Sequence, residues 1–254
     1  MLRSRITPCL LVHKNGLVKT VGFKDPKYVG DPINAVKIFN EKQVDELIVL
    51  DIDASVQGRG PDFELIRKLA LECRMPLCYG GGVTTVEEAK KIISLGAEKV
   101  AISSAAIKNF ELLSEIGKAV GIQSVVVVLD IKKTGFLGSY EIYIHNGKKA
   151  TGIKVKDFVP RLAKIGIGEL VINSIDGDGT MRGYDFSLVD MVRDLTEFPI
   201  TILGGAGSLE DIKSAIKRYK IIGAAAGSLF VFRGKYRAVL INYPNILEKK
   251  ELYR

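Results

Sequence analysis

Short apolar runs alternate with amphipathic stretches along the whole of this 254-residue chain. Eight runs, rich in β-branched residues, predict buried strands. They cover residues 5–12, 46–52, 77–80, 99–103, 124–130, 169–174, 200–203 and 221–225. Between them, helical spacing of apolar residues is clearest at 86–95 and 209–216, behind the caps Thr84-Thr85 and Gly207-Ser208. Eight strands, each followed by a helix or a long connection, predict a (β/α)8 TIM barrel formed by one domain, residues 1–254.

The chain also repeats itself at half its length. Residues 79–82 match 203–206, and residues 102–104 match 226–228, both at an offset of 124. Residues 45–48 match 168–171, and residues 9–16 match 128–135, at slightly smaller offsets. Four matches in the same order predict two half-barrel repeats, about 1–122 and 123–254, related by a pseudo-twofold axis.

Charge, cysteine and histidine content, and the lack of a long apolar run bear on which ligands and which cellular location are expected. The net charge of +8 comes from scattered basic residues without interleaved aromatics, which favours attraction for phosphorylated or acidic small molecules over nucleic acid. Three cysteines, Cys9, Cys73 and Cys78, without metal-type spacing indicate free thiols, and the two histidines make a His-rich metal site an unfavourable interpretation. No metal or organic cofactor is implied. The absence of a signal peptide and of a long apolar run predicts a cytoplasmic protein outside the membrane.

The strongest catalytic candidate from position alone is Asp130. It ends the apolar run 125–129, and the C-terminal ends of barrel strands are where chemistry is done. The alternative is a solvated aspartate that only terminates a strand. In the other half of the repeat its counterpart is Leu11, so a symmetric pair of carboxylates that divides acid and base duties is not available.

Glycine clusters follow the third strand of each half, and a Gly/Ser turn follows the fourth. Backbone N–H groups of such turns cradle anions, so two matched pockets suit a ligand with a phosphate at each end. The alternative is that the glycines make tight strand-to-helix turns. The predicted phosphate-binding residues are Gly81, Gly82, Ser103 and Ser104 in the first half, and Gly204, Gly205, Gly227 and Ser228 in the second.

These clusters, together with residues 49–52, Leu129-Asp130 and residues 174–180, resemble the cyclase subunit family of imidazole glycerol phosphate synthase, HisF. The resemblance spans about residues 1–230. It implies a half-barrel-repeat (β/α)8 fold, a HisH-like glutaminase docked at the N-terminal face, and ammonia that passes through the barrel to a bisphosphate substrate.

The resemblance also implies roles for single residues. Arg5, Glu46, Lys99 and Glu169 match the charged ring that gates ammonia at the barrel floor. Glu98 matches an acidic residue that contacts the glutaminase. Lys19 matches the lysine of a mobile first loop that closes over substrate, and Asp51 and Asp178 match acids of the active-site mouth.

Two departures from the family set the functional alternatives. Leu11 stands at the position of the first catalytic aspartate, and the tail 230–244 resembles the divergent glycosyl amidation (WbuZ-type) branch. The first hypothesis is therefore an ammonia-conducting subunit that serves amidination of an N-acetyl sugar in surface-polysaccharide biosynthesis, with a sugar amidotransferase as a further partner. The second is a true cyclase in histidine biosynthesis, and the third is a non-catalytic activator of the glutaminase. The apolar tail around 239–241 is expected to pack under the barrel rather than form a partner contact.

Overall fold

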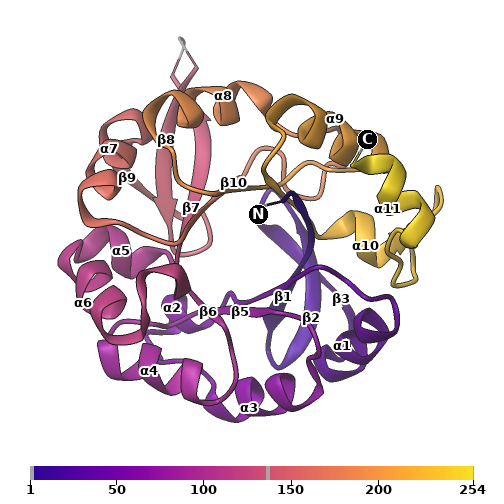
Figure 1. The fold of residues 1–254 in the computed structure, drawn as a ribbon, viewed down its shortest axis with the longest axis horizontal. Coiled ribbons are helices and arrows are strands. Elements are labelled where there is room, and N and C mark those ends of the chain that lie inside the picture. The colour runs from indigo at the N-terminus through magenta and orange to yellow at the C-terminus, as the bar shows by residue number, and fades with distance from the viewer. Residues whose placement is uncertain (1–2, 136–137, 254) are drawn as a thin grey trace.

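The computed structural model describes residues 3–135 and 138–253. Eight parallel strands form a closed barrel, because the path β10-β11-β12-β1-β4-β5-β6-β7 returns to its start through the β10–β7 pairing (Figure 1). The strands are β1 (Arg5–His13), β4 (Leu47–Asp51), β5 (Leu77–Gly80), β6 (Lys99–Ile102), β7 (Val125–Thr134), β10 (Glu169–Ser174), β11 (Ile200–Leu203) and β12 (Gly223–Ala226). Every apolar run predicted as a strand is one, and the TIM barrel is confirmed.

Helices surround this barrel and bury its outward face. The long ones are α1 (Pro32–Glu41), α3 (Phe63–Glu72), α4 (Val86–Ser94), α6 (Glu111–Val120), α7 (Val155–Ile165), α8 (Phe186–Leu195) and α9 (Leu209–Tyr219). Short helices α2 (Ala54–Gln57), α5 (Ser104–Lys108) and α10 (Ser228–Val231), and the 3-10 turn η1 (Ile122–Ser124), lie at strand ends. Capping boxes start α4 at Thr85 and α9 at Ser208, as the sequence predicts.

Side chains alternate between two cores along each strand. On β1, Ile6 and Leu10 face the helices and belong to the large outer core. Arg5, Thr7 and Cys9 occupy the other face, which points into the barrel lumen. The inner core is small and mostly apolar, and its buried members are Cys9, Ile48, Cys78, Ala101, Val126, Val128, Val171, Leu203 and Ala225. The lumen is therefore lined mainly by apolar side chains, and the charged residues Arg5, Glu46, Lys99 and Glu169 lie at one end of it.

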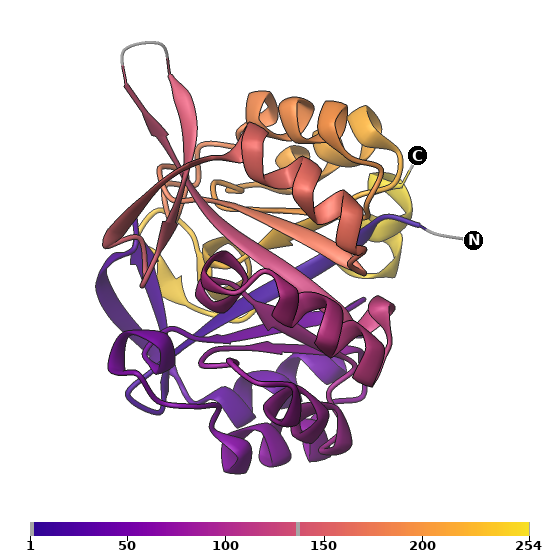
Figure 2. The ribbon, with the colours of Figure 1, turned by 90° about the vertical axis from the view of Figure 1, so that its left-hand side faces the viewer.

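Two antiparallel extensions were not predicted. After β1 the chain forms β2 (Gly16–Val21) and β3 (Lys24–Gly30), and β7 continues past Asp130 to pair with β8 (Ser139–Ile144), which pairs with β9 (Lys149–Lys154). The β7–β8 hairpin projects from the barrel in Figures 1 and 2. Residue pairs with positive φ, each followed by glycine, lie in the turn between β1 and β2 (Lys14-Asn15) and in the turn between β8 and β9 (His145-Asn146).

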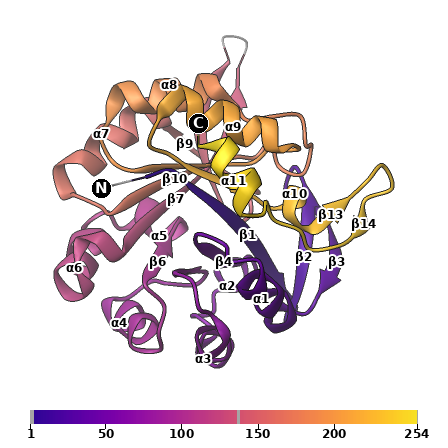
Figure 3. The same cartoon turned by 45° about the vertical axis from the view of Figure 1, so that its right-hand side comes forward.

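The C-terminal segment returns to the barrel as a small hairpin, β13 (Phe232–Arg233) with β14 (Ala238–Val239), followed by α11 (Ile246–Leu252) (Figure 3). The expected packing of residues 239–241 is only partly found, because Val239 and Leu240 are 47% and 50% exposed while Ile241 packs against the core. Further along the tail, Tyr243 and Leu252 are buried. Among the described helices, not one combines the length and the apolar character needed to cross a membrane.

Candidate functional site

A cavity of about 570 Å³ opens at the C-terminal ends of the barrel strands. It is lined by all four predicted catalytic residues and by all eight predicted phosphate-binding residues. Leu11 lines it too. Residues from both halves of the chain thus meet in one concave space, which is the usual location of a barrel active site.

Asp130 faces this cavity from β7. Its Oδ1 accepts a hydrogen bond of 2.9 Å from the Asn173 side-chain amide on the neighbouring strand β10, where the two residues are in register. Burial raises the pKa of Asp130 to about 7, with Asp178 adding to the rise and the Asn173 hydrogen bond opposing it. A carboxyl group with a pKa near neutrality can both donate and accept a proton under ordinary conditions.

Asp178 is held by the β2–β3 hairpin. The Thr20 hydroxyl and the Phe23 backbone N–H donate to its Oδ2 over 2.6 and 3.0 Å. Burial raises the pKa of Asp178, while those hydrogen bonds and the Lys19 charge oppose the shift. The β2–β3 hairpin therefore forms hydrogen bonds to a loop that belongs to the second half of the chain.

Lys19 departs from its expected setting. It lies in strand β2 rather than in a loop, it is 6% exposed, and its Nζ donates to the Cys9 carbonyl over 2.6 Å. A Cβ added at Gly227 would lie 2.6 Å from the Lys19 Nζ, so the ammonium group sits beside the second glycine pocket. Pairing of β2 with both β1 and β3 orders a segment that sequence comparison alone assigns to a mobile loop.

Asp51 ends β4 on the opposite side of the cavity. Its Oδ2 pairs with the Arg59 guanidinium at 2.7 Å, and its Oδ1 accepts from the backbone N–H groups of Asp53 and Ala54. The aspartate thus organises the loop 51–59 as well as facing the cavity. Arg59 brings a positive charge to the first glycine pocket.

The glycines are needed by the backbone itself. Gly81 and Gly205 have φ of +127° and +109°, and an added Cβ would approach the Asp51 carbonyl to 2.5 Å and clash with the Gly183 carbonyl. Tight turns therefore account for these positions whether or not an anion binds. At the starts of the helices that follow the turns, α4 and α9, Thr85 and Ser208 accept from helix N–H groups. Glu88 and Asp211 accept from the N–H groups of the N-cap and of the residue before it.

The Gly/Ser turns are different. Ser104 and Ser228 begin α5 and α10, and within the described residues neither helix start has a side-chain cap. The backbone N–H groups of these two turns are the donors that remain available to an anion in the cavity. The Ser104 hydroxyl accepts from the His145 backbone N–H at 3.5 Å, which links the first pocket to the β8–β9 turn.

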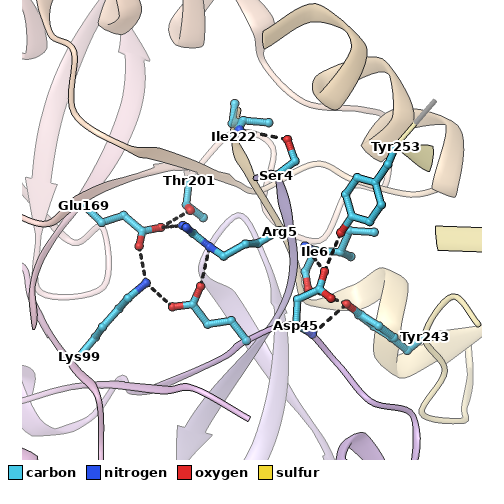
Figure 4. Close-up of polar contacts among 11 residues, drawn as sticks. Ser4, Arg5, Ile6, Asp45, Lys99, Glu169, Thr201, Ile222, Tyr243 and Tyr253 are labelled. Carbon is cyan, nitrogen blue, oxygen red and sulfur yellow. Dashed lines mark hydrogen bonds and ion pairs between the residues drawn. The ribbon is translucent and has the colours of Figure 1, made fainter. Parts of the chain in front are cut away.

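At the other end of the lumen, four charged side chains form a closed ring (Figure 4). Arg5 pairs with Glu46 at 2.8 Å and with Glu169 at 2.7 Å, and Lys99 pairs with the same two carboxylates at 2.5 and 2.7 Å. The Thr201 hydroxyl also donates to Glu169. Two acids and two bases, three from strands β1, β6 and β10 and Glu46 from the position just before β4, thus neutralise one another, as the sequence resemblance implies they should be arranged.

Burial works against every charge in this ring, and the pairing reverses the effect for three of them. The pKa values of Arg5 and Lys99 are raised, because the two carboxylates outweigh the burial that alone would lower them. Burial would raise the pKa of Glu169, but Arg5 and Lys99 lower it, whereas burial together with the Glu169 charge raises the pKa of Glu46. The ring is stable only while it is complete.

The C-terminal tail is anchored close to this ring (Figure 4). The Tyr243 hydroxyl donates to the Ile6 carbonyl over 2.8 Å and accepts from the Asp45 N–H at 3.2 Å. Asp45 in turn accepts from the Ile6 N–H, the Tyr253 hydroxyl and Lys249. These bonds tie the tail to β1 at the barrel floor.

Comparison with known proteins agrees with this geometry. A family model described as "Histidine biosynthesis protein" matches residues 5–237. A protein of Leptospira borgpetersenii, "Putative imidazole glycerol phosphate synthase subunit HisF", is 53% identical over 100% of both chains. A Vibrio vulnificus protein, "Putative imidazole glycerol phosphate synthase subunit hisF3", is 53% identical over 99% of this chain and 96% of its own. The "Imidazole glycerol phosphate synthase subunit HisF" of Alkaliphilus metalliredigens is 38% identical over 91% of each chain.

The chain belongs to the HisF family.

Within this HisF-type barrel, sequence reasoning missed several residues of the mouth. Asn173 could not be linked to Asp130 without the β7–β10 register. His145 and Asn146 reach over the first half of the cavity, where their side chains bond the carbonyls of Ser55 and Ile52 at 3.1 and 2.7 Å. The Asn-Gly pairs at 15–16 and 146–147 are the signal that would have found both hairpins.

Glu98 lies outside the cavity, immediately before β6 and next to Lys99 of the ring, and it is exposed. This places it at the floor face of the HisF-type barrel, where its role in contacting a glutaminase stays a prediction. Groups of three or more His, Cys, Asp or Glu suited to a metal ion do not occur among the residues described.

Proposed function

We propose that this chain is the synthase subunit of a glutamine amidotransferase, which takes ammonia from a HisH-like glutaminase through the barrel to a phosphorylated substrate. The observation that carries the proposal is the closed ring of Arg5, Glu46, Lys99 and Glu169 at one end of the lumen, with the cavity of Asp130 at the other. The names of the HisF relatives support the same family-level role.

The ring suits a gate for a small neutral molecule. Its charges cancel, so it offers no net attraction to an ion, and each of its members is fixed by two partners. Opening a path would require one ion pair to break and its charges to find temporary partners, a step that a docked subunit could favour. Exposed Glu98, adjacent to Lys99, is the proposed contact for that subunit.

Leu11 at the mouth of the cavity bears on which substrate is used. Leu11 cannot transfer a proton, so a reaction that divides acid and base duties between two facing carboxylates is short of one group. A conduit that delivers ammonia onward does not need that pair. We therefore propose cytoplasmic amidination of an N-acetyl sugar for surface polysaccharide as the pathway, with a sugar amidotransferase as the receiving partner.

A second candidate is the cyclase reaction of imidazole glycerol phosphate synthase in histidine biosynthesis. One specific observation favours it: Asp130, Lys19, Asp51 and Asp178 share one cavity with both glycine pockets, so the mouth is otherwise complete. In this case Asp130, with its pKa near neutrality, would act as the sole proton-transfer group.

One assay separates the two candidates. The purified chain is mixed with ammonium chloride and the bisphosphate precursor of imidazole glycerol phosphate, and loss of the precursor is followed, with and without a HisH-type glutaminase and glutamine. The proposed function predicts turnover at least about 10²-fold below that of a complete acid–base pair. Normal turnover would establish the cyclase instead.

Leu11→Asp tests whether restoring a carboxyl group restores activity. Leu11→Asn is the matched control, because asparagine has a shape similar to aspartate but no titratable proton. Activity that appears with Asp and not with Asn would show that the rest of the mouth is competent. If both variants remain silent although the fold is intact, the precursor is the wrong substrate.

A further inference from the structure

The lumen contains one hydroxyl that the ring and the mouth do not use. Thr7 lies on β1 between Arg5 of the ring and Cys9 at the cavity, and its side chain is 0% exposed. Its Oγ1 has no hydrogen-bond partner among the described residues of the protein. A strand advances about 3.3 Å per residue, so Thr7 is roughly 7 Å from each of these two neighbours along the strand.

Among the described residues, the polar neighbours of Thr7 form their contacts with other groups. Its in-register neighbour on β12 is Ala225, which is itself fully buried. On the β4 side the two carboxylate oxygens of Glu46 form ion pairs, one with Arg5 and one with Lys99. The Thr201 hydroxyl, another polar group of the lumen, already donates to Glu169.

The rest of the passage is poorly suited to hydrogen bonding. The inner core is built from aliphatic side chains and the thiols of Cys9 and Cys78. Burial raises the pKa of Cys9 to about 11 and holds that of Cys78 well above its ordinary value, so both are neutral thiols and weak hydrogen-bonding groups. A valine would fill the same space as Thr7 without the cost of burying an unpaired hydroxyl.

We propose that Thr7 is a binding station for a small, neutral hydrogen-bonding molecule, ammonia or water, inside the barrel between the charged ring and the cavity. An ion would not be accommodated, because the walls are apolar and the station supplies a single dipole. Ammonia can accept from the hydroxyl or donate to it, so the side chain serves a molecule that arrives in any orientation. As a stage of ammonia transfer, this inference rests on the proposed function, but the site itself can be tested on the isolated chain.

The first test uses thermal unfolding of the isolated protein. Thr7→Val should leave the Tm unchanged or raise it, because an unpaired buried hydroxyl is replaced by a methyl group of the same shape. The matched control is Thr201→Val, which breaks an observed hydrogen bond and should lower the Tm. A comparable drop for Thr7→Val would mean that the hydroxyl has a structural partner, and the inference would be wrong.

The second test is crystallographic. Crystals of the wild type and of Thr7→Val are soaked in ammonium chloride at pH 9, where a substantial share of the probe is neutral ammonia. We expect an ordered guest within hydrogen-bond distance of Oγ1 in the wild type and no guest there in the variant. An empty position in the wild type, or the same density in both, overturns the proposal.

The third test asks whether the station serves transfer. In the complex with the glutaminase, Thr7→Val should lower the rate of product formation from glutamine about three- to tenfold, which is the effect of one hydrogen bond. The rate of product formation from added ammonium should be unchanged. Thr7→Ser, which keeps the hydroxyl, should restore coupling. If the wild type and Thr7→Val form product from glutamine at the same rate, the proposed role of Thr7 is wrong, and the proposed passage of ammonia through the barrel is unaffected. A wild type that responds only to added ammonium refutes the conduit and, with it, a transfer role for Thr7.

Discussion

Asp130→Asn should stabilise the protein, and the stabilisation should grow with pH. The carboxyl group is half-buried in the cavity wall beside a neutral amide, and its pKa is raised from 3.8 to about 7. The folded state therefore keeps a proton that the unfolded chain releases, so stability is greatest at low pH and is lost as the pH rises toward 7. Asparagine has the same shape, can accept from Asn173 through its own oxygen, and does not titrate.

The magnitude follows from the shift. The pKa difference is about three units, and each unit corresponds to about 1.36 kcal/mol, so the ionised carboxylate costs the fold about 4 kcal/mol at high pH. Only about 1 kcal/mol of this cost is present at pH 4.5, because the unfolded carboxyl group is still partly protonated there. The advantage of Asp130→Asn over the wild type should therefore rise by about 3 kcal/mol between pH 4.5 and pH 8.5.

Urea unfolding of both proteins at several pH values measures this difference directly. Asp194→Asn is the control, because Asp194 is exposed and its substitution should change the free energy of unfolding by less than about 0.5 kcal/mol. If the Asp130→Asn advantage is the same at pH 4.5 and pH 8.5, the carboxyl group is not held in the proposed environment. The interpretation of Asp130 as a proton-transfer group near neutral pH would then be refuted.

Three further perturbations test other parts of the structure. Lys99→Met should lower the free energy of unfolding by about 3–5 kcal/mol, because it leaves two buried carboxylates with one cation, whereas the exposed Lys90→Met should have an effect below about 0.5 kcal/mol in the same denaturation assay. Gly81→Ala should lower the Tm clearly more than Gly152→Ala does. Both glycines have positive φ, but of the two only Gly81 would bring the new Cβ close to a carbonyl, and thermal unfolding of the two variants tests this difference. Tyr243→Phe should cost about 1–2 kcal/mol by freeing the Ile6 carbonyl, and wild-type stability in this variant would show that the tail does not anchor the floor.

The barrel strands could be predicted from the sequence because parallel strands buried on both faces are continuous apolar runs of characteristic length. The hairpins were missed because polar residues interrupt the sequence at 13–30 and 131–154, so that neither segment contains such a run, although Asn-Gly marks both turns. The register that joins Asn173 to Asp130 is a property of two distant strands, and local pattern does not contain it.

The charged ring illustrates a different limit. Charged residues at strand starts are ordinarily solvated ends, so pattern alone gives no reason to group Arg5, Glu46, Lys99 and Glu169. The family resemblance grouped them, and the structure brings their side chains together on one axis. Their functional role remains a matter for the experiments described above.

The three acids of the cavity mouth, Asp51, Asp130 and Asp178, differ in the groups that contact them, and from this difference we infer different roles. Asp51 is paired with the Arg59 guanidinium and organises its own loop. Asp178 is bound by the first hairpin and lies within the field of Lys19. Asp130 is held by a neutral amide, and among the described residues it has no cationic hydrogen-bond partner; its pKa of about 7 suits proton exchange near neutral pH. If the mouth performs proton transfer, that transfer passes through Asp130, and Asp51 and Asp178 serve to shape the cavity around it.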